Sequence, residues 1–182
     1  MSKLDTYLGL VKRLITSLNN SGIDYMFTGA IAASYYGTPR TTMDVDIIIH
    51  TTQQNTAKLN QTLQNAGIHP DKQKIDNALN TGYNIATLKD TLTPYTLDLI
   101  LAKDPLEKRP GTISGLPTYI QTPEHLIISK LRMIKASINH GKAAKDEEDI
   151  KSIIEYTQVD LNKVKKRAKE ENTHTLLKTI IG

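Results

Sequence analysis

The chain has 182 residues, which suffice for one well-buried core but hardly for two full domains. It contains no cysteine, which excludes disulfides, thiolate zinc sites and cysteine nucleophiles, and favours a reducing compartment. No apolar run approaches the roughly 20 residues of a membrane span, and residues 1–10 lack the apolar core of a signal peptide. We therefore expect a soluble, cytoplasmic protein with no membrane partner.

The formal net charge of +4 and the pI near 9.1 are mild, and they favour an anionic partner without requiring one. Between Lys103 and Lys142, seven basic residues outnumber three acidic ones. A second basic cluster follows and consists of Lys163, Lys165, Lys166, Arg167 and Lys169. The simplest interpretation of both clusters is a pair of solvated helix faces, and contact with RNA phosphates is the functional alternative.

The spacing of apolar residues, together with Gly, Pro and Asn as breakers, predicts alternating short helices and strands. In chain order we expect a helix over 4–18, a strand over 23–28, a helix over 30–36, a strand over 43–50, a helix over 52–66, a weaker helix over 71–79, and strands over 83–88 and 95–101. Gly29, Gly37 and Gly67 are expected to end the elements before them.

The Pro/Gly-rich stretch 105–117 is expected to be a connecting segment and an internal boundary. Beyond Pro123 the pattern is helical throughout. One apolar stripe consists of Ile127, Leu131, Ile134 and Ile138, and a second of Ile150, Ile153 and Ile154. We therefore expect a core over 1–120 followed by a helical subdomain over 121–182.

Two aspartates interrupt the buried strand 43–50. Alternation along the strand places Asp44 and Asp46 on one face, about 7 Å apart, and the apolar residues on the other. Two like charges in a low-dielectric setting repel unless a cation or hydrogen-bond donors compensate them. Oxygen ligands without cysteine or ligand-spaced histidine favour Mg²⁺ or Mn²⁺ over zinc. The structural alternative is that Asp44 merely begins the strand.

A third carboxylate is expected from the strand 95–101, where Asp98 points away from the apolar face. If this strand pairs beside Asp46, the three carboxylates come together and suit two metal ions roughly 4 Å apart. An ordinary salt bridge is the alternative for Asp98, and Asp90 is the other candidate for the third carboxylate. The five histidines are scattered singly and are interpreted as ordinary surface or core residues.

A glycine turn precedes the aspartates. Gly29 and Ala30 stand where a strand ends and a helix begins, and backbone N–H groups at such a helix start bind phosphate oxygens. The loop Gly37-Thr38-Pro39-Arg40-Thr41-Thr42 then leads to the aspartate pair, so that residues 31–43 separate the turn from Asp44. A glycine turn is common in proteins, and it indicates a phosphate-binding site here only in combination with this spacing to the aspartate pair.

With these residues in place, the sequence resembles the polymerase-beta-like nucleotidyltransferase superfamily, whose signature is Gly-Gly or Gly-Ser, such a spacer, Asp-x-Asp and a later carboxylate. More narrowly, it is similar to the minimal nucleotidyltransferases, including the AbiEii-type toxins of toxin–antitoxin pairs. The narrower similarity extends to Glu124 to Leu131 and to Lys145 to Ile150. The resemblance implies an α+β nucleotidyltransferase fold, with a short mixed β-sheet flanked by helices and a helical C-terminal part.

The resemblance also implies roles for basic and acidic residues outside the aspartate strands. It implies that Lys130 acts catalytically on a phosphate, and that Lys145, Asp146 and Asp149 line the nucleotide or buttress Lys130. A snorkelling side chain is the alternative for Lys130, and helix N-terminal acids are the alternative for the segment after Lys145. Arg40 is placed four residues before Asp44 and is expected either to neutralise a triphosphate or to pair with nearby aspartates.

The expected reaction is transfer of an NMP from an NTP, such as ATP, to a hydroxyl of an acceptor. Asp44, Asp46 and Asp98 are expected to bind Mg²⁺ or Mn²⁺, while Gly29 and Ala30 position phosphate. The expected acceptor is an RNA or tRNA end or a partner protein, and the resemblance implies a role in a toxin–antitoxin pair. One alternative is an inactive nucleotide- or nucleic-acid-binding regulator, because Ala30 replaces the usual Gly or Ser; another is a purely structural interaction protein. The sequence predicts neither the base nor the oligomeric state.

Overall fold

The computed structural model describes residues 3–51, 55–137 and 140–182. Its helices are α1 (Lys3–Ser21), α2 (Gly29–Tyr36), α3 (Thr56–Asn65), α4 (Lys72–Asn80), α5 (Pro123–Ala136), α6 (His140–Tyr156), α7 (Leu161–Glu170) and α8 (His174–Ile181). Its strands are β1 (Tyr25–Phe27), β2 (Asp44–His50), β3 (Ile85–Lys89), β4 (Thr96–Ala102), β5 (Lys108–Ile113) and β6 (Leu116–Gln121). Within these residues no helix combines the length and the apolar character needed to cross a membrane.

The chain divides into two compact units that are not continuous in sequence. The first comprises Met1–Gly29 and Thr42–Ile120, and the second comprises Ala30–Thr41 and Gln121–Gly182. The residues between Ala30 and Thr41 therefore pack with the C-terminal helices. The expected division into a core over 1–120 and a subdomain over 121–182 stays a prediction.

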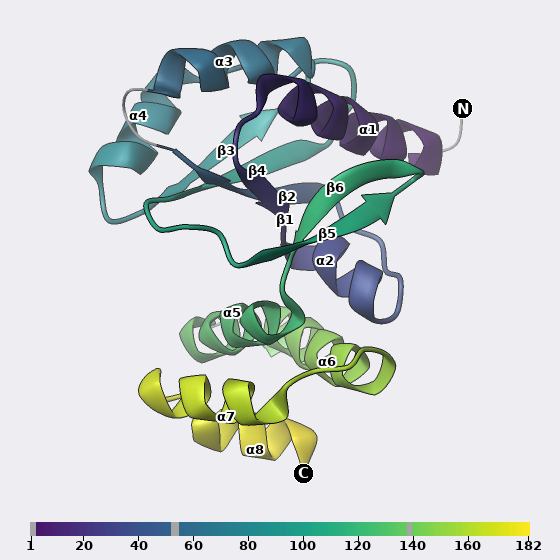
Figure 1. Ribbon diagram of the computed structural model, residues 1–182, viewed down its shortest axis with the longest axis vertical. Helices are drawn as coiled ribbons and strands as arrows, with labels where there is room; N and C mark the ends of the chain where they lie inside the picture. Colours follow the sequence, from purple (N-terminus) through teal and green to yellow (C-terminus); the bar gives the residue numbers. More distant parts are fainter. Residues whose placement is uncertain (1–2, 52–54, 138–139) are drawn as a thin grey trace. The chain divides into compact units, whose positions relative to one another are not determined.

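The first unit is built on a six-stranded sheet in the order β3-β4-β2-β1-β6-β5 (Figure 1). β2 runs parallel to β4 and antiparallel to β1, while β3 runs antiparallel to β4. The sheet is therefore mixed, as expected. The expected strands over 23–28, 43–50, 83–88 and 95–101 all form, with ends that differ by at most two residues.

The expectation of a connecting segment over 105–117 was wrong. Most of this stretch forms β5 and the start of β6, which are neighbours in the sheet. The turn between them contains Ser114 and Gly115 in the left-handed region, with φ of 49° and 79°. β5 lies at the edge of the sheet, where Pro110 is tolerated because an edge strand has backbone positions without a ladder partner. Proline and glycine therefore mark an edge strand and its turn here.

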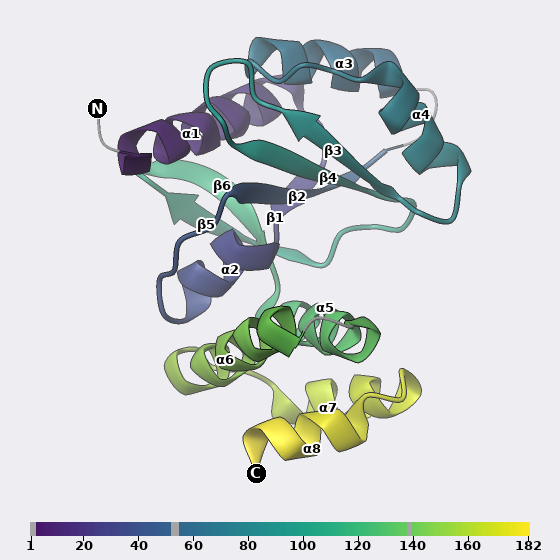
Figure 2. The same ribbon diagram turned by 180° about the vertical axis from the view of Figure 1, so that it is seen from behind.

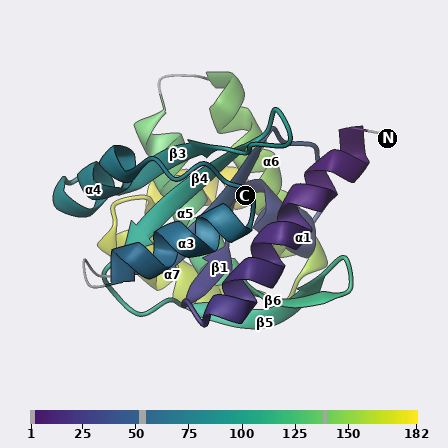
Figure 3. The same cartoon turned by 90° about the horizontal axis from the view of Figure 1, so that it is seen from above.

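Apolar residues of alternate strand positions form the core of the first unit. Val45, Ile47, Leu97 and Leu99 are fully buried. α1 and α3 cross one face of the sheet (Figures 2 and 3), and their own apolar stripes are buried as well. The expected helix over 52–66 is present from Thr56 onward, and residues 52–54 lie outside the described part of the chain.

The second unit joins α2 to the four C-terminal helices, as the helical pattern beyond Pro123 predicted. Its buried core includes Ile127, Leu131, Ile150 and Ile153; Ile138, expected in the same stripe, lies outside the described residues. The Tyr36 hydroxyl donates to the backbone oxygen of Gln121 at 2.7 Å, which ties the end of α2 to the segment before α5.

A charged pair links α5 to the residue that follows α7. Arg132 donates to both carboxylate oxygens of Glu171, and this hydrogen bonding is the main cause of the lowered pKa of Glu171. A carboxylate with a depressed pKa stabilises the fold at pH values above its unfolded pKa, and this contribution is lost as the pH falls through the folded pKa.

We expect Glu171→Gln to lower folding stability at neutral pH and to leave it unchanged at strongly acidic pH, measured as urea midpoints across a pH series. An equal loss at every pH would contradict the assignment.

Candidate functional site

The three expected carboxylates lie together on two neighbouring strands of the first unit. In the parallel pairing of β2 and β4, Asp46 is opposite Asp98 and Asp44 is opposite Thr96. Residues opposite each other in adjacent strands are about 4.8 Å apart and project from the same face. Asp44, Asp46 and Asp98 are called the aspartate row below. The row lies on the face opposite the buried residues of both strands.

Threonine hydroxyls from neighbouring positions orient two members of the aspartate row. Thr96 Oγ donates to Asp44 Oδ1 at 2.6 Å, and Thr87 Oγ donates to Asp98 Oδ1 at 2.6 Å. Both donors are neutral, so they fix the carboxylates without cancelling their charge. Among the described ion pairs, none includes Asp44 or Asp98. Negative charge is therefore concentrated on this face.

Sequence reasoning missed both threonines, although a signal for them was present. Thr96 stands two residues before Asp98 and therefore shares its face, and Thr87 is opposite Asp98 in the pairing of β3 with β4. Identifying them requires the register of three strands. Alternation alone assigns the face of a side chain but not its partner.

The donor set of the aspartate row suits a hard divalent cation. All its donors are carboxylate oxygens, the ligands that Mg²⁺ and Mn²⁺ prefer. Within the described residues, however, no group of three or more His, Cys, Asp or Glu side chains is arranged to hold an ion as it stands. Each threonine donates to one oxygen of its carboxylate, so these two bonds leave the second oxygen of Asp44 and of Asp98 unused. Metal binding by the row stays a prediction.

Gly29 lies directly against Asp46. Gly29 has a φ of 58°, and a Cβ atom added there would come within 3.0 Å of Oδ2, Cγ and Cβ of Asp46. Thr28, just before it, donates its backbone N–H to the Asp46 carbonyl at 3.0 Å. Because α2 begins at Gly29, the first turn of this helix also leaves backbone N–H groups without intrahelical partners. The turn thus combines a close approach to the row with donors suited to phosphate.

Replacing Gly29 by alanine should destabilise the first unit by about 2–3 kcal/mol, because left-handed backbone and a close contact both oppose a side chain. Gly22→Ala is the matched control: its φ is 65°, but nothing lies within 4 Å of the added atom. We expect the control to lose only roughly 1 kcal/mol. Unfolding in urea measures both values. Adding Asp46→Ala to Gly29→Ala should recover part of the loss, and equal losses for the two glycine variants would contradict the close approach.

Asp90, the alternative third carboxylate, is already paired. Arg13 Nη2 donates to its two carboxylate oxygens at 2.7 and 2.8 Å, and Arg13 Nε donates to the backbone oxygen of Ala66 at 2.9 Å. The Asp90 side chain is fully buried in this pair. The register thus places Asp98, and not Asp90, beside Asp46. Whether Asp98 acts in catalysis stays a prediction.

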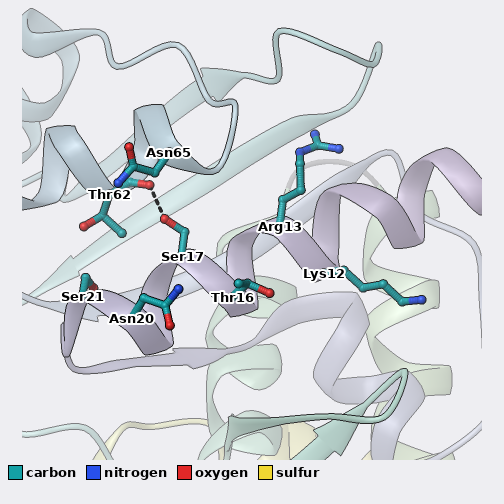
Figure 4. Close-up of a pocket in the computed structure, with 8 residues that line it drawn as sticks. All are labelled: Lys12, Arg13, Thr16, Ser17, Asn20, Ser21, Thr62 and Asn65. Atoms are coloured by element: carbon teal, nitrogen blue, oxygen red, sulfur yellow. Dashed lines mark hydrogen bonds between the residues drawn. The ribbon is translucent and has the colours of Figure 1, made fainter.

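A surface groove of about 420 Å³ lies between α1 and α3 in the same unit (Figure 4). Its lining consists of Lys12, Arg13, Thr16, Ser17, Asn20, Ser21, Thr62 and Asn65. Two of its polar groups are engaged in holding the helices together, since Ser17 Oγ donates to the Thr62 carbonyl at 2.6 Å and Arg13 holds Asp90. None of the predicted site residues lines the groove, so it is separate from the aspartate row.

In the second unit, four of the other predicted site residues form a charge cluster around the buried Lys130. Lys130 Nζ lies 2.8 Å from Asp146 Oδ1 and 2.7 Å from Asp149 Oδ2. Arg40 donates from Nε to Asp149 Oδ1 and from Nη2 to Asp149 Oδ2, both at 3.0 Å. These four residues are called the Lys130 cluster below. Two cations and two carboxylates give it no net charge.

The contacts of the Lys130 cluster bear on the roles expected of its members. The Lys130 side chain is only 5% exposed and its ammonium is shared by two carboxylates, so a phosphate would have to compete with both. Arg40 is more accessible, at 31%, and within the described residues Asp149 is its ion-pair partner. Lys145 is exposed and takes no part in the described ion pairs, and Ala30 is buried in α2. Nucleotide contacts by these residues stay predictions.

No protein-family model matches the chain, and no curated sequence does. The structure, in contrast, is similar in fold to several solved structures. ANT(2'')-Ia, described as an antibiotic-resistance factor, matches with a TM-score of 0.67 and 13% identity over 96% of both chains. The chain has a nucleotidyltransferase fold.

Two further structures share this nucleotidyltransferase fold. An antigenic nucleotidyltransferase-like protein from Paracoccidioides brasiliensis matches with a TM-score of 0.56 and 20% identity over 92% of both chains. The lincosamide antibiotic adenylyltransferase LnuA matches with a TM-score of 0.53 and 14% identity, over 79% of this chain and 96% of that one. The expected fold class is therefore confirmed, while the AbiEii-type branch stays a prediction.

Proposed function

We propose that the protein is a metal-dependent nucleotidyltransferase that transfers an NMP from an NTP to an acceptor hydroxyl. The observation that carries this proposal is the aspartate row: three carboxylates on one face of two paired strands, two of them held by neutral hydroxyls and without a cationic partner in the described residues. Such a concentration of charge is tolerable when a divalent cation shares it. The nucleotidyltransferase fold provides independent support.

Each member of the row has a proposed task. Asp44 and Asp46 hold the ion, which when bound offsets charge on the triphosphate oxygens. Asp98 accepts the proton of the acceptor hydroxyl as its oxygen bonds to the α-phosphorus. The bond from the α-phosphorus to the bridging oxygen then breaks, and pyrophosphate leaves. Gly29 keeps the chain close to Asp46 so that backbone N–H groups at the start of α2 reach phosphate.

The acceptor is proposed from the charge of the chain and from the sequence resemblance. An RNA or tRNA end fits the basic character of the chain, and a partner protein is the other acceptor that we propose to test. The toxin–antitoxin role rests on the sequence resemblance alone. Among the structural counterparts, ANT(2'')-Ia has been solved in complex with adenylyl-2''-tobramycin, so a small-molecule acceptor belongs in the same experiment.

The test is an incubation of the protein with each labelled NTP, Mg²⁺ and one acceptor class at a time. Total tRNA, a cell-extract protein fraction and an aminoglycoside provide three kinds of hydroxyl. We expect label transfer in one arm and none from Asp44→Ala/Asp46→Ala. Transfer that survives the double substitution would rule out the aspartate row as the site. Tight, metal-dependent NTP binding without transfer in any arm would support the regulator instead.

A further inference from the structure

The positive charge of the chain is concentrated in its last two helices. Residues 161–182 contain six basic and two acidic side chains, a net charge of +4. Residues 1–160 contain 17 of each and are formally neutral. The whole excess of +4 is thus carried by about an eighth of the chain, on α7 and α8, which lie side by side in both views of the second unit (Figures 1 and 2).

Basic residues make up most of the solvent-facing side of α7. Val164 and Ala168 are the buried positions of this helix. Exposed Asn162 and Glu170 share the solvent-facing side with five basic residues: Lys163, Lys165, Lys166, Arg167 and Lys169. Within the described residues, no ion pair engages Lys165, Lys166 or Lys169. Charges without an ion-pair partner in the described part of the chain are suited to bind a ligand.

α8 adds to the same surface. Lys178 lies in its last turn and His174 at its start. Desolvation, followed by the positive charges of Lys178, Lys169 and Lys165, lowers the pKa of His174 from its ordinary value. Lys165 and Lys169 stand one helical turn apart on α7, and α8 lies beside α7 (Figures 1 and 2). Their side chains and that of Lys178 on α8 are exposed, and the three are called one patch below.

Two acidic residues accompany the six basic ones in residues 161–182. Glu171, which follows α7, is engaged by Arg132 from α5 and by Arg167, so its charge is used within the fold. Glu170 is exposed at the end of α7 and offsets one positive charge of the patch. The patch thus differs from the Lys130 cluster, in which each cation has a carboxylate partner.

We propose that Lys165, Lys169 and Lys178, with the other cations of α7, form a surface that binds the phosphate backbone of a nucleic acid. The composition of the surface favours this partner. None of the exposed large hydrophobic residues of the described chain lies on α7 or α8. Protein interfaces use aromatic or aliphatic anchors, and helices that lie on membranes insert an apolar face. Lysines alone suffice for phosphates, whose recognition requires no reading of bases.

The binding surface does not depend on the aspartate row. Its contribution to transfer, delivery of a nucleic-acid hydroxyl as the acceptor, rests on the proposed function. Failure of the binding surface and failure of the proposed function are distinguishable, because nucleic-acid binding is measured without NTP or Mg²⁺ and transfer is measured separately.

The experiment measures fluorescence anisotropy of labelled tRNA and of duplex DNA over a series of salt concentrations. The test variant is Lys165→Gln/Lys169→Gln/Lys178→Gln. The control variant, Lys58→Gln/Lys72→Gln/Lys89→Gln, removes the same charge from exposed lysines of the first unit. We expect the test variant to bind at least ~tenfold more weakly and its salt slope to fall by about three, while the control resembles the wild type.

Several outcomes would contradict the proposal that this surface binds nucleic acid. One is equal affinity and slope for wild type and test variant, and another is equal weakening of both variants, which would indicate a general charge effect. Tighter binding of poly-glutamate than of either nucleic acid would indicate an acidic protein partner. Circular dichroism and thermal unfolding check that the variants fold. Asp44→Asn/Asp46→Asn should bind as the wild type does; if it does but still transfers label, the proposed function fails while the surface stands.

Discussion

Asp46→Asn is expected to lower nucleotide transfer on the order of a thousandfold, because charge stabilisation by a metal contributes several kcal/mol to such a reaction. Its effect on folding stability, in contrast, should be neutral or favourable. The substitution removes a negative charge that lies on β2 together with Asp44 and opposite Asp98 on β4. Without metal, the variant should therefore unfold at the same or a higher temperature than the wild type.

Thermal unfolding with and without Mn²⁺ separates the two effects. The wild type should gain stability from Mn²⁺ and NTP, since a ligand that binds only the folded state stabilises it, and Asp46→Asn should gain little. Asp76→Asn is the matched control, because Asp76 is an exposed residue of α4 outside the site. A variant that loses transfer because it has unfolded, or one that keeps its Mn²⁺ response, would contradict the assignment.

Lys130→Met should cost about 3–5 kcal/mol of folding stability, since removal of one partner leaves buried charges uncompensated. Asp149 would retain Arg40, but Asp146 would lose the cation 2.8 Å from its Oδ1. Methionine keeps most of the volume of lysine, so the loss reports charge more than packing. Urea unfolding provides the measurement.

Two further variants decide what the lysine does. Adding Asp146→Asn to Lys130→Met should restore part of the lost stability, because it removes the carboxylate left alone. Lys135→Met, on the same helix but exposed, should change stability little. If Lys130→Met folds as stably as the wild type and loses only transfer, Lys130 serves the reaction and the buried cluster does not hold the helices together.

The face of each aspartate was predictable from sequence, but its partners were not. Alternation along 43–50 and 95–101 was sufficient to place Asp44, Asp46 and Asp98 away from the apolar face. Asp98 and Asp90 remained alternatives because strand order and register depend on contacts between distant segments. The register places Asp98 opposite Asp46, while Arg13, far away in sequence, engages Asp90.

The limits of sequence reasoning elsewhere have similar physical causes. Proline and glycine predicted an irregular connection before Leu116, but an edge strand tolerates proline, so β5 was missed. For Lys130, spacing along a helix identified an inward-facing cation but did not identify what it faces. The Lys130 ammonium forms ion pairs with two carboxylates of α6. This pairing depends on how α5 and α6 pack.

Because the second unit is discontinuous in sequence, it restricts how the chain can be truncated or recombined, in evolution and in protein engineering. Residues 30–41 are encoded in the middle of the strand-rich segment, yet Thr38 and Arg40 bond to Ser152 and Asp149 of α6. A polypeptide that stops at residue 120 would retain this stretch while losing those partners. The C-terminal helices therefore cannot be exchanged for an unrelated module by a single crossover, and a functional transplant would have to carry both pieces together.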